Sequence, residues 1–194
     1  MKSKLMLLAV LGMAATNVAF AHGDTTGDTT CPVSAQIAMD ATFGAGTSAI
    51  TSCIVHREHI RVAISMGSNT LNPKSGINQV LVNVVNMSNN YEQMYSLTVG
   101  DEGYRIAVVG HFQGGQSLLT DDAYNRLHNV TTGNPNRPTV EKLLAKGIQF
   151  IMCQNTMRAN NWVTSDLIPG VTEAPAGVVA LTDFGMQGWV LLTP

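Results

Sequence analysis

Cys153 is the residue whose type and position most clearly predict chemistry. It ends the apolar run 148–153 (IQFIMC) and is followed by the polar residues of 154–156 (QNT), which favour a helix start. A thiol at a helix N-terminus faces unpaired backbone N–H groups and the positive end of the helix dipole, and both favour the thiolate. The thiolate attacks sulfur, accepts sulfane sulfur or binds a soft metal. The spacing also fits an inert buried cysteine, because free cysteine packs as a small hydrophobe.

A second candidate segment, 111–116 (HFQGGQ), follows the apolar run 104–110. His111 can supply a proton or a hydrogen bond, and Gly114 and Gly115 allow a close approach of the backbone to a ligand. We therefore predict ligand-binding roles for His111, Gln113, Gly114 and Gly115, and for Asn155 near the cysteine. A loop histidine bonded to backbone is the alternative for His111. The segment has neither Walker nor Rossmann glycine spacing.

The remaining patterns indicate neither a metal site nor a cofactor. The chain contains no HExxH, CxxC, GxSxG or EF-hand sequence. His22 would lead the mature chain, and its amine and imidazole could chelate copper, but no third ligand is evident. We expect no bound metal and no cofactor.

Two of the three cysteines, Cys31 and Cys53, flank a segment rich in Ala, Gly, Ser and Thr. In an oxidising compartment an odd number of cysteines suggests one disulfide and one free thiol. We predict a Cys31–Cys53 bridge, worth about 3 kcal/mol by chain entropy. The alternative is that both are unpaired.

Alternating elements must position these side chains. Apolar runs predict strands, apolar residues at helical spacing predict helices, and Pro138 and Gly147 suit the start and end of one helix. The expected strands are 59–66, 104–110, 148–153, 171–174 and 189–192; the expected helices are 77–97, 138–146, a short one after 153, and 176–186. This order predicts an α/β domain with a mostly parallel sheet. Segments 65–69, 110–117 and 153–156 then meet at the carboxyl edge, where such sheets bind ligands.

The N-terminus predicts export. Lys2 and Lys4 precede an apolar run over 5–15, and residues 19–21 (AFA) fit a cleavage site, so we expect a signal peptide over 1–21 and a periplasmic or secreted protein. Residues 22–58 then form a flexible or disulfide-stapled extension, and residues 59–194 form one domain. We expect no later membrane span. The net charge of −2 argues against nucleic-acid binding.

Three segments resemble the DsrE/DsrF-like family of sulfur-relay proteins: 147–157 (GIQFIMCQNTM), 166–171 (DLIPGV) and 187–194 (QGWVLLTP). The resemblance covers about 104–194 and extends plausibly back to 59. It implies a three-layer α/β/α fold, trimers or hexamers, and a cysteine, here Cys153, that accepts sulfur as a persulfide. Where relay members often have glycine eight residues after the cysteine, this chain has Asn161, which tolerates the same left-handed geometry. The export signal is a second departure, because cytoplasmic members work in a reducing compartment.

Two functions from different classes follow. The first is an exported sulfur carrier, at most sulfurtransferase-like, in which Cys153 exchanges sulfane sulfur with a donor or acceptor protein. The second is a non-catalytic periplasmic module that binds a small ligand or assembles as an oligomer. Gain of one sulfur atom on Cys153 discriminates between them.

Overall fold

The fold consists of a parallel sheet flanked by helices. The computed structural model describes residues 31, 33–51 and 59–194. The strands are β1 (Ile60–Met66), β2 (Tyr104–Gly110), β3 (Gln149–Cys153), β4 (Thr172–Ala174) and β5 (Val190–Leu192). The α-helices are α1 (Val33–Phe43), α2 (Gln79–Gln93), α3 (Asp121–His128), α4 (Arg137–Ala145), α5 (Gln154–Asn160) and α6 (Gly177–Met186). Three short 3-10 helices are η1 (Ser48–Ile50), η2 (Phe112–Leu118) and η3 (Thr164–Asp166).

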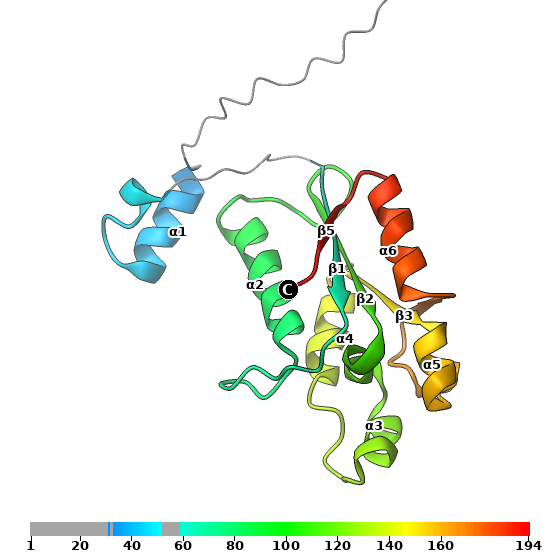
Figure 1. The fold of residues 1–194 in the computed structure, drawn as a ribbon. Helices are drawn as coiled ribbons and strands as arrows, with labels where there is room; N and C mark the ends of the chain where they lie inside the picture. The colour runs from blue at the N-terminus through cyan, green and yellow to red at the C-terminus, as the bar shows by residue number, and fades with distance from the viewer. Residues whose placement is uncertain (1–30, 32, 52–58) are drawn as a thin grey trace, which may run out of the picture.

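The five strands are all parallel and lie in the order β4-β3-β2-β1-β5. From β1 to β4, each new strand is added on the same side of the one before it. The chain then crosses back over the sheet through α6, and β5 pairs with the other side of β1. The change of direction puts α6 on the opposite face from α2 and α4, as right-handed crossovers require. Figure 1 shows the resulting three layers, with α2 and α4 on one side of the sheet and α6 on the other. The predicted three-layer α/β/α fold is confirmed.

The sheet has two unequal hydrophobic interfaces. The larger one joins alternate strand residues, such as Ile64, Val108 and Phe150, to the apolar faces of α2 and α4. The smaller one joins Ala63, Ala107 and Trp189 to α6. Small residues on this second face let α6 lie close to the sheet, so the start of α6 comes near the ends of the central strands.

Local signals set several element boundaries. The side chain of Asn78 accepts the Val80 N–H and begins α2, and Pro138 lies in the first turn of α4. Gly147 has φ 92°, the left-handed conformation expected beyond that helix. Asn161 is also left-handed and ends α5, as predicted. The short α5 therefore stops cleanly and leaves its first turn beside Cys153.

Some elements differ from the prediction. The apolar pattern predicts no helix over Asp121–His128, where α3 forms behind a Thr120 cap, and it treats Phe112–Leu118 as a loop, where η2 forms. The expected helix over 77–97 is shorter at both ends. The described helices include none long and apolar enough to cross a membrane.

The N-terminal segment, expected to be a flexible or disulfide-stapled extension, contains the helix α1. Cys31, Ala35 and Met39 are buried and pack against Met94 and Tyr95, which follow α2. Cys31 is disulfide-bonded, whereas Cys153 is free. Cys53 and the expected signal peptide lie outside the described residues, so the Cys31–Cys53 pairing and the cleavage site stay predictions.

Candidate functional site

The candidate site lies at the carboxyl edge of the sheet, where three central strands end together. Met66 of β1 is paired with Gly110 of β2, and Gly110 with Met152 of β3. The residues that follow these strand ends, His111 and Cys153 among them, therefore share one rim. The rim is the place where an open parallel sheet is expected to bind a ligand.

Cys153 lies in the wall of a cavity of about 290 Å³ at this rim. Its side chain is buried, with 5% of its surface exposed. The cavity walls come from the end of β3, from α5, from the residues after β2 and from the start of α6; they are His111, Phe112, Cys153, Asn155, Thr156, Ala159, Asn160, Ala176, Gly177 and Val178. Phe112 and Val178 are 71% and 65% exposed, so the cavity opens to solvent beside them. The thiol is covered by protein but can be reached through the cavity.

The surroundings of the sulfur favour its ionised form. Burial raises the pKa of Cys153, but hydrogen bonding outweighs it, and the pKa lies below the ordinary value of a thiol. The hydroxyl of Thr156 and the backbone N–H groups of Thr156, Gly177 and Asn155 supply this hydrogen bonding. Donors aimed at the charged form stabilise it, and a larger thiolate fraction makes the sulfur more reactive near neutral pH.

Thr156 is held in place by the segment after β2. Its Oγ1 accepts a hydrogen bond from the Phe112 N–H at 3.0 Å, which leaves its own hydrogen available to the sulfur. Phe112 adopts a left-handed backbone, φ 47°, which is uncommon for a bulky residue. This conformation points the Phe112 N–H at Thr156 and its ring at solvent. The residues that follow β2 and β3 together orient the Thr156 hydroxyl.

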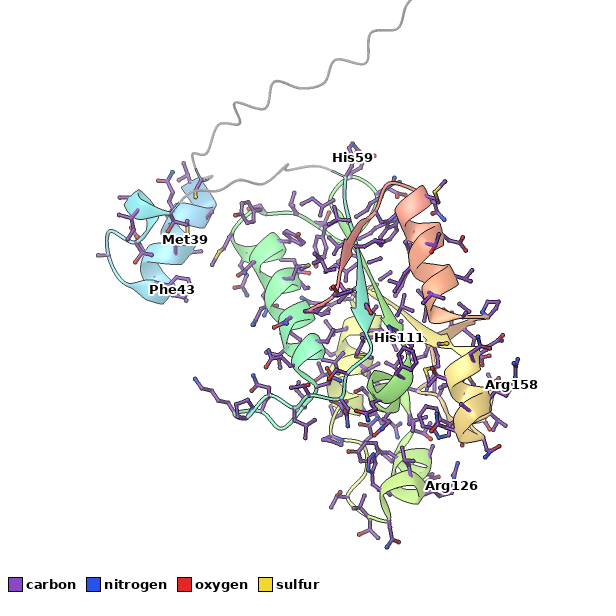
Figure 2. All side chains as sticks on the ribbon, viewed as in Figure 1. Met39, Phe43, His59, His111, Arg126 and Arg158 are labelled. Carbon is purple, nitrogen blue, oxygen red and sulfur yellow. The ribbon has the colours of Figure 1, made fainter. Side chains whose placement is uncertain are left out.

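His111 forms a second polar group on the same rim. Its Nε2 lies 2.7 Å from Oγ of Ser65, and burial lowers its pKa below the ordinary value. A Cβ on Gly67 would stand 2.9 Å from His111 Cε1, and one on Gly177 would stand 3.1 Å from its Cβ. The imidazole therefore fits between two residues without side chains. Figure 2 shows it beside the strand ends, on the side that carries α5.

The predicted site residues separate into two groups. Cys153, His111 and Asn155 line the cavity together. Gln113 is exposed, Gly114 and Gly115 are buried, and none of the three lines the cavity. A Cβ on Gly114 would stand 2.1 Å from the Met66 carbonyl oxygen. In this structure the two glycines pack η2 against the sheet, and their ligand-binding roles stay predictions.

Among the site residues that sequence reasoning missed, three form hydrogen bonds with the Cys153 sulfur or the His111 ring. Thr156 lies three residues after the cysteine. At this spacing a side chain in the first turn of a helix faces the residue that begins the helix, so the sequence did contain a signal for Thr156. Ser65 belongs to a strand that alternates in the expected way but carries no motif. Gly177 reaches the site from α6, and only the crossover to β5 brings it there.

Among the residues that the structure describes, no Asp, Glu, Lys or Arg lines the cavity. Arg158, the basic residue of α5, donates to the Asn155 side chain at 3.4 Å and points away from His111 in Figure 2. Across the part of the chain that the structure describes, no three His, Cys, Asp or Glu side chains gather as a metal site would require. Charge in this cavity is accommodated at the sulfur, where the hydrogen-bond donors converge.

Comparison with solved structures finds the same fold elsewhere. The protein of unknown function MTH1491 from Methanobacterium thermoautotrophicum aligns with a TM-score of 0.51 and 24% identity, over 70% of this chain and 99% of that chain. The ychN protein from E. coli aligns over the same shares with 15% identity and a TM-score of 0.47. No protein-family model matches the sequence, and no curated protein matches it significantly. The likeness to MTH1491 is one of fold alone.

Proposed function

We propose that this protein carries sulfane sulfur on Cys153. The observation that supports the proposal best is the free, cavity-facing thiol of Cys153, whose pKa is lowered by converging hydrogen bonds. A thiolate of this kind is the form that attacks a sulfane sulfur atom. The three-layer α/β/α fold, with a cysteine at the end of β3, agrees with the DsrE/DsrF-like resemblance seen in the sequence.

The proposed step is a transfer between two sulfur atoms. The Cys153 thiolate attacks the outer sulfur of a donor persulfide, R–S–SH, and the S–S bond of the donor breaks. The products are Cys153–S–SH and the thiolate R–S⁻, so no external oxidant is consumed. A thiolate acceptor takes the outer sulfur by the same step in reverse. The hydrogen-bond donors that favour ionised Cys153 also lie close to the new terminal sulfur of the persulfide. That sulfur carries the negative charge after the persulfide loses its proton.

We propose that this carrier acts outside the cytoplasm, after removal of residues 1–21. The disulfide at Cys31 agrees with an oxidising compartment, because such bonds persist there. We also propose that the mature chain assembles as a trimer or hexamer, which light scattering coupled to size exclusion measures directly. N-terminal sequencing of the exported protein tests the cleavage.

The decisive experiment is mass spectrometry of the mature protein after treatment with a persulfide donor. We expect a gain of about 32 Da that maps to Cys153 and is removed by dithiothreitol. The Cys153→Ser variant should gain nothing. If wild type also gains nothing while iodoacetamide still reaches Cys153, the carrier function is wrong. Recovery of a tightly bound small molecule from Cys153→Ser protein would instead support the non-catalytic binding module.

A further inference from the structure

The end of the cavity at Cys153 is polar, whereas the walls away from it are largely apolar. The converging donors, namely the Thr156 hydroxyl and the three backbone N–H groups, act at the sulfur of Cys153. Away from the sulfur the wall is built largely from small or apolar side chains, including Phe112, Ala159 and Val178. A negative charge at the reacting sulfur is stabilised, whereas a charge farther out meets no counter-ion among the described residues of the wall.

The polar side chains of the wall do not change this balance. His111 is uncharged near neutral pH, because its pKa is lowered by burial, and its Nε2 is already engaged with Ser65. The Asn155 side-chain oxygen accepts from Arg158, and Asn160 donates to the Thr156 carbonyl oxygen at 2.8 Å. Among the described residues of the wall, these groups supply no cation to pair with a carboxylate. Burying an unpaired carboxylate is costly.

The geometry points to a substrate class: Cys153 takes its sulfur from small hydropersulfides whose carbon portion is uncharged, in preference to donors that carry a carboxylate. This inference rests on the proposed sulfur-carrier function and names the donor for it. During the reaction, negative charge develops on the two sulfur atoms, close to the hydrogen-bond donors around Cys153. The leaving thiolate departs through the opening beside Phe112 and Val178. The apolar wall holds the rest of the donor.

The test compares two donors that differ by one charge. The persulfide of N-acetylcysteine carries a carboxylate, and the persulfide of its methyl ester does not. Each is mixed with the mature protein, and the rate of the gain of about 32 Da at Cys153 is divided by the rate with an unstructured cysteine peptide. We expect the corrected rate to be about tenfold higher for the ester, because the acid must bury an unpaired charge. Equal rates, or a faster acid, overturn the inference and leave the carrier function standing. No gain from either donor overturns both.

A charge added at the rim provides the second arm. Val178→Lys places a cation at the mouth of the cavity, where it pairs with the donor's carboxylate. We expect the acid-to-ester rate ratio to rise about fivefold. Ile50→Lys adds the same charge at an exposed position of the N-terminal segment and should leave the ratio unchanged. An unchanged ratio in Val178→Lys, or an equal rise in Ile50→Lys, contradicts a role for cavity charge in donor choice.

Discussion

Phe112, Thr156 and Cys153 form a chain of contacts in which each member depends on the one before it. The Phe112 N–H occupies an acceptor position on the Thr156 hydroxyl, and that hydroxyl then lowers the pKa of Cys153. The strained backbone of Phe112 is the starting point of this arrangement. Residues held in sparsely populated conformations persist where the surrounding structure requires them, and they cluster at functional sites.

Replacing Thr156 should change the reactivity of the thiol without removing it. Thr156→Val deletes the hydroxyl donor, so the pKa of Cys153 rises and its alkylation by iodoacetamide near neutral pH slows by about tenfold. The pKa is measured from the pH dependence of thiolate absorbance. Thr156→Ser keeps the hydroxyl and should behave like wild type. Equal pKa values in wild type and Thr156→Val would show that the backbone N–H groups alone ionise the sulfur.

His111 should make the stability of the protein depend on pH. Its pKa in the folded protein is lowered from 6.5 by burial, so the unfolded chain binds more protons just below that pH. The stability contributed by neutral His111 is complete above the unfolded pKa of about 6.5 and is lost as the pH falls through the folded pKa. Urea unfolding from about pH 7.5 to about pH 5.5 should show this loss in wild type. His111→Asn should lose less over the same range; an identical loss would assign the effect to other groups.

The sequence alone predicted only part of the site. Cys153, His111 and Asn155 follow recognisable strands, and parallel strands bring their carboxyl ends together. Ser65 and Gly177 could not be found in this way, because their roles depend on how closely β1 and α6 approach His111. Such distances are set by packing between elements and leave no local pattern.

At the scale of elements, η2 is the part that joins the strand ends to the cavity. It packs so closely on the sheet that Gly114 has no room for a side chain: a Cβ would meet the Met66 carbonyl oxygen at 2.1 Å. At Gly115 the obstacle is the flexible end of Met152, at 2.7 Å. The Met66 carbonyl oxygen belongs to the backbone and cannot move aside, whereas the terminal methyl of Met152 can.

The two glycines should therefore respond differently to substitution. Gly114→Ala should lower the free energy of unfolding by about 3 kcal/mol, because either η2 or β1 must move. Gly115→Ala should cost clearly less, because Met152 can change rotamer. Urea denaturation of the two variants measures the difference. Equal costs would mean that η2 adjusts as a unit.

The elements that the sequence predicted are those with a strong apolar pattern. The run of β2 is buried along almost its whole length, so its type and bounds were predicted correctly. In α3 only Ala123 is buried, so no apolar stripe marks the helix, and it forms behind the Thr120 cap with acidic residues in its first turn. The 3-10 helix η2 contains two glycines, which disfavour a helix prediction and are required here by close packing.

At the scale of the whole molecule, the N-terminal segment and the sheet domain have separate hydrophobic clusters. Cys31, Ala35 and Met39 pack on Met94 and Tyr95 and are absent from the main core. The disulfide at Cys31 therefore constrains a segment whose hydrophobic cluster is separate from the main core.

Removing that disulfide should loosen the N-terminal segment alone. In a Cys31→Ala/Cys53→Ala variant we expect limited proteolysis before residue 59 to speed up several-fold, because a short helix with a small core loses its covalent constraint. The alkylation rate of Cys153 should not change. Cys153→Ala provides the matched control, since it should leave the proteolysis pattern unaltered. Slower alkylation of Cys153 in the double variant would reveal a coupling between the two parts.

The contribution of Gly177 to the sulfur has a consequence for the newly made chain. Its N–H belongs to the first residue of α6, so it reaches Cys153 only when the chain beyond β4 has folded against the rim. Until then the pKa of the thiol is lowered only by Thr156 and Asn155, which lie within three residues of Cys153 in the sequence. The full acidity of the thiol therefore belongs to the completed fold, and a chain that is still folding holds a less acidic one.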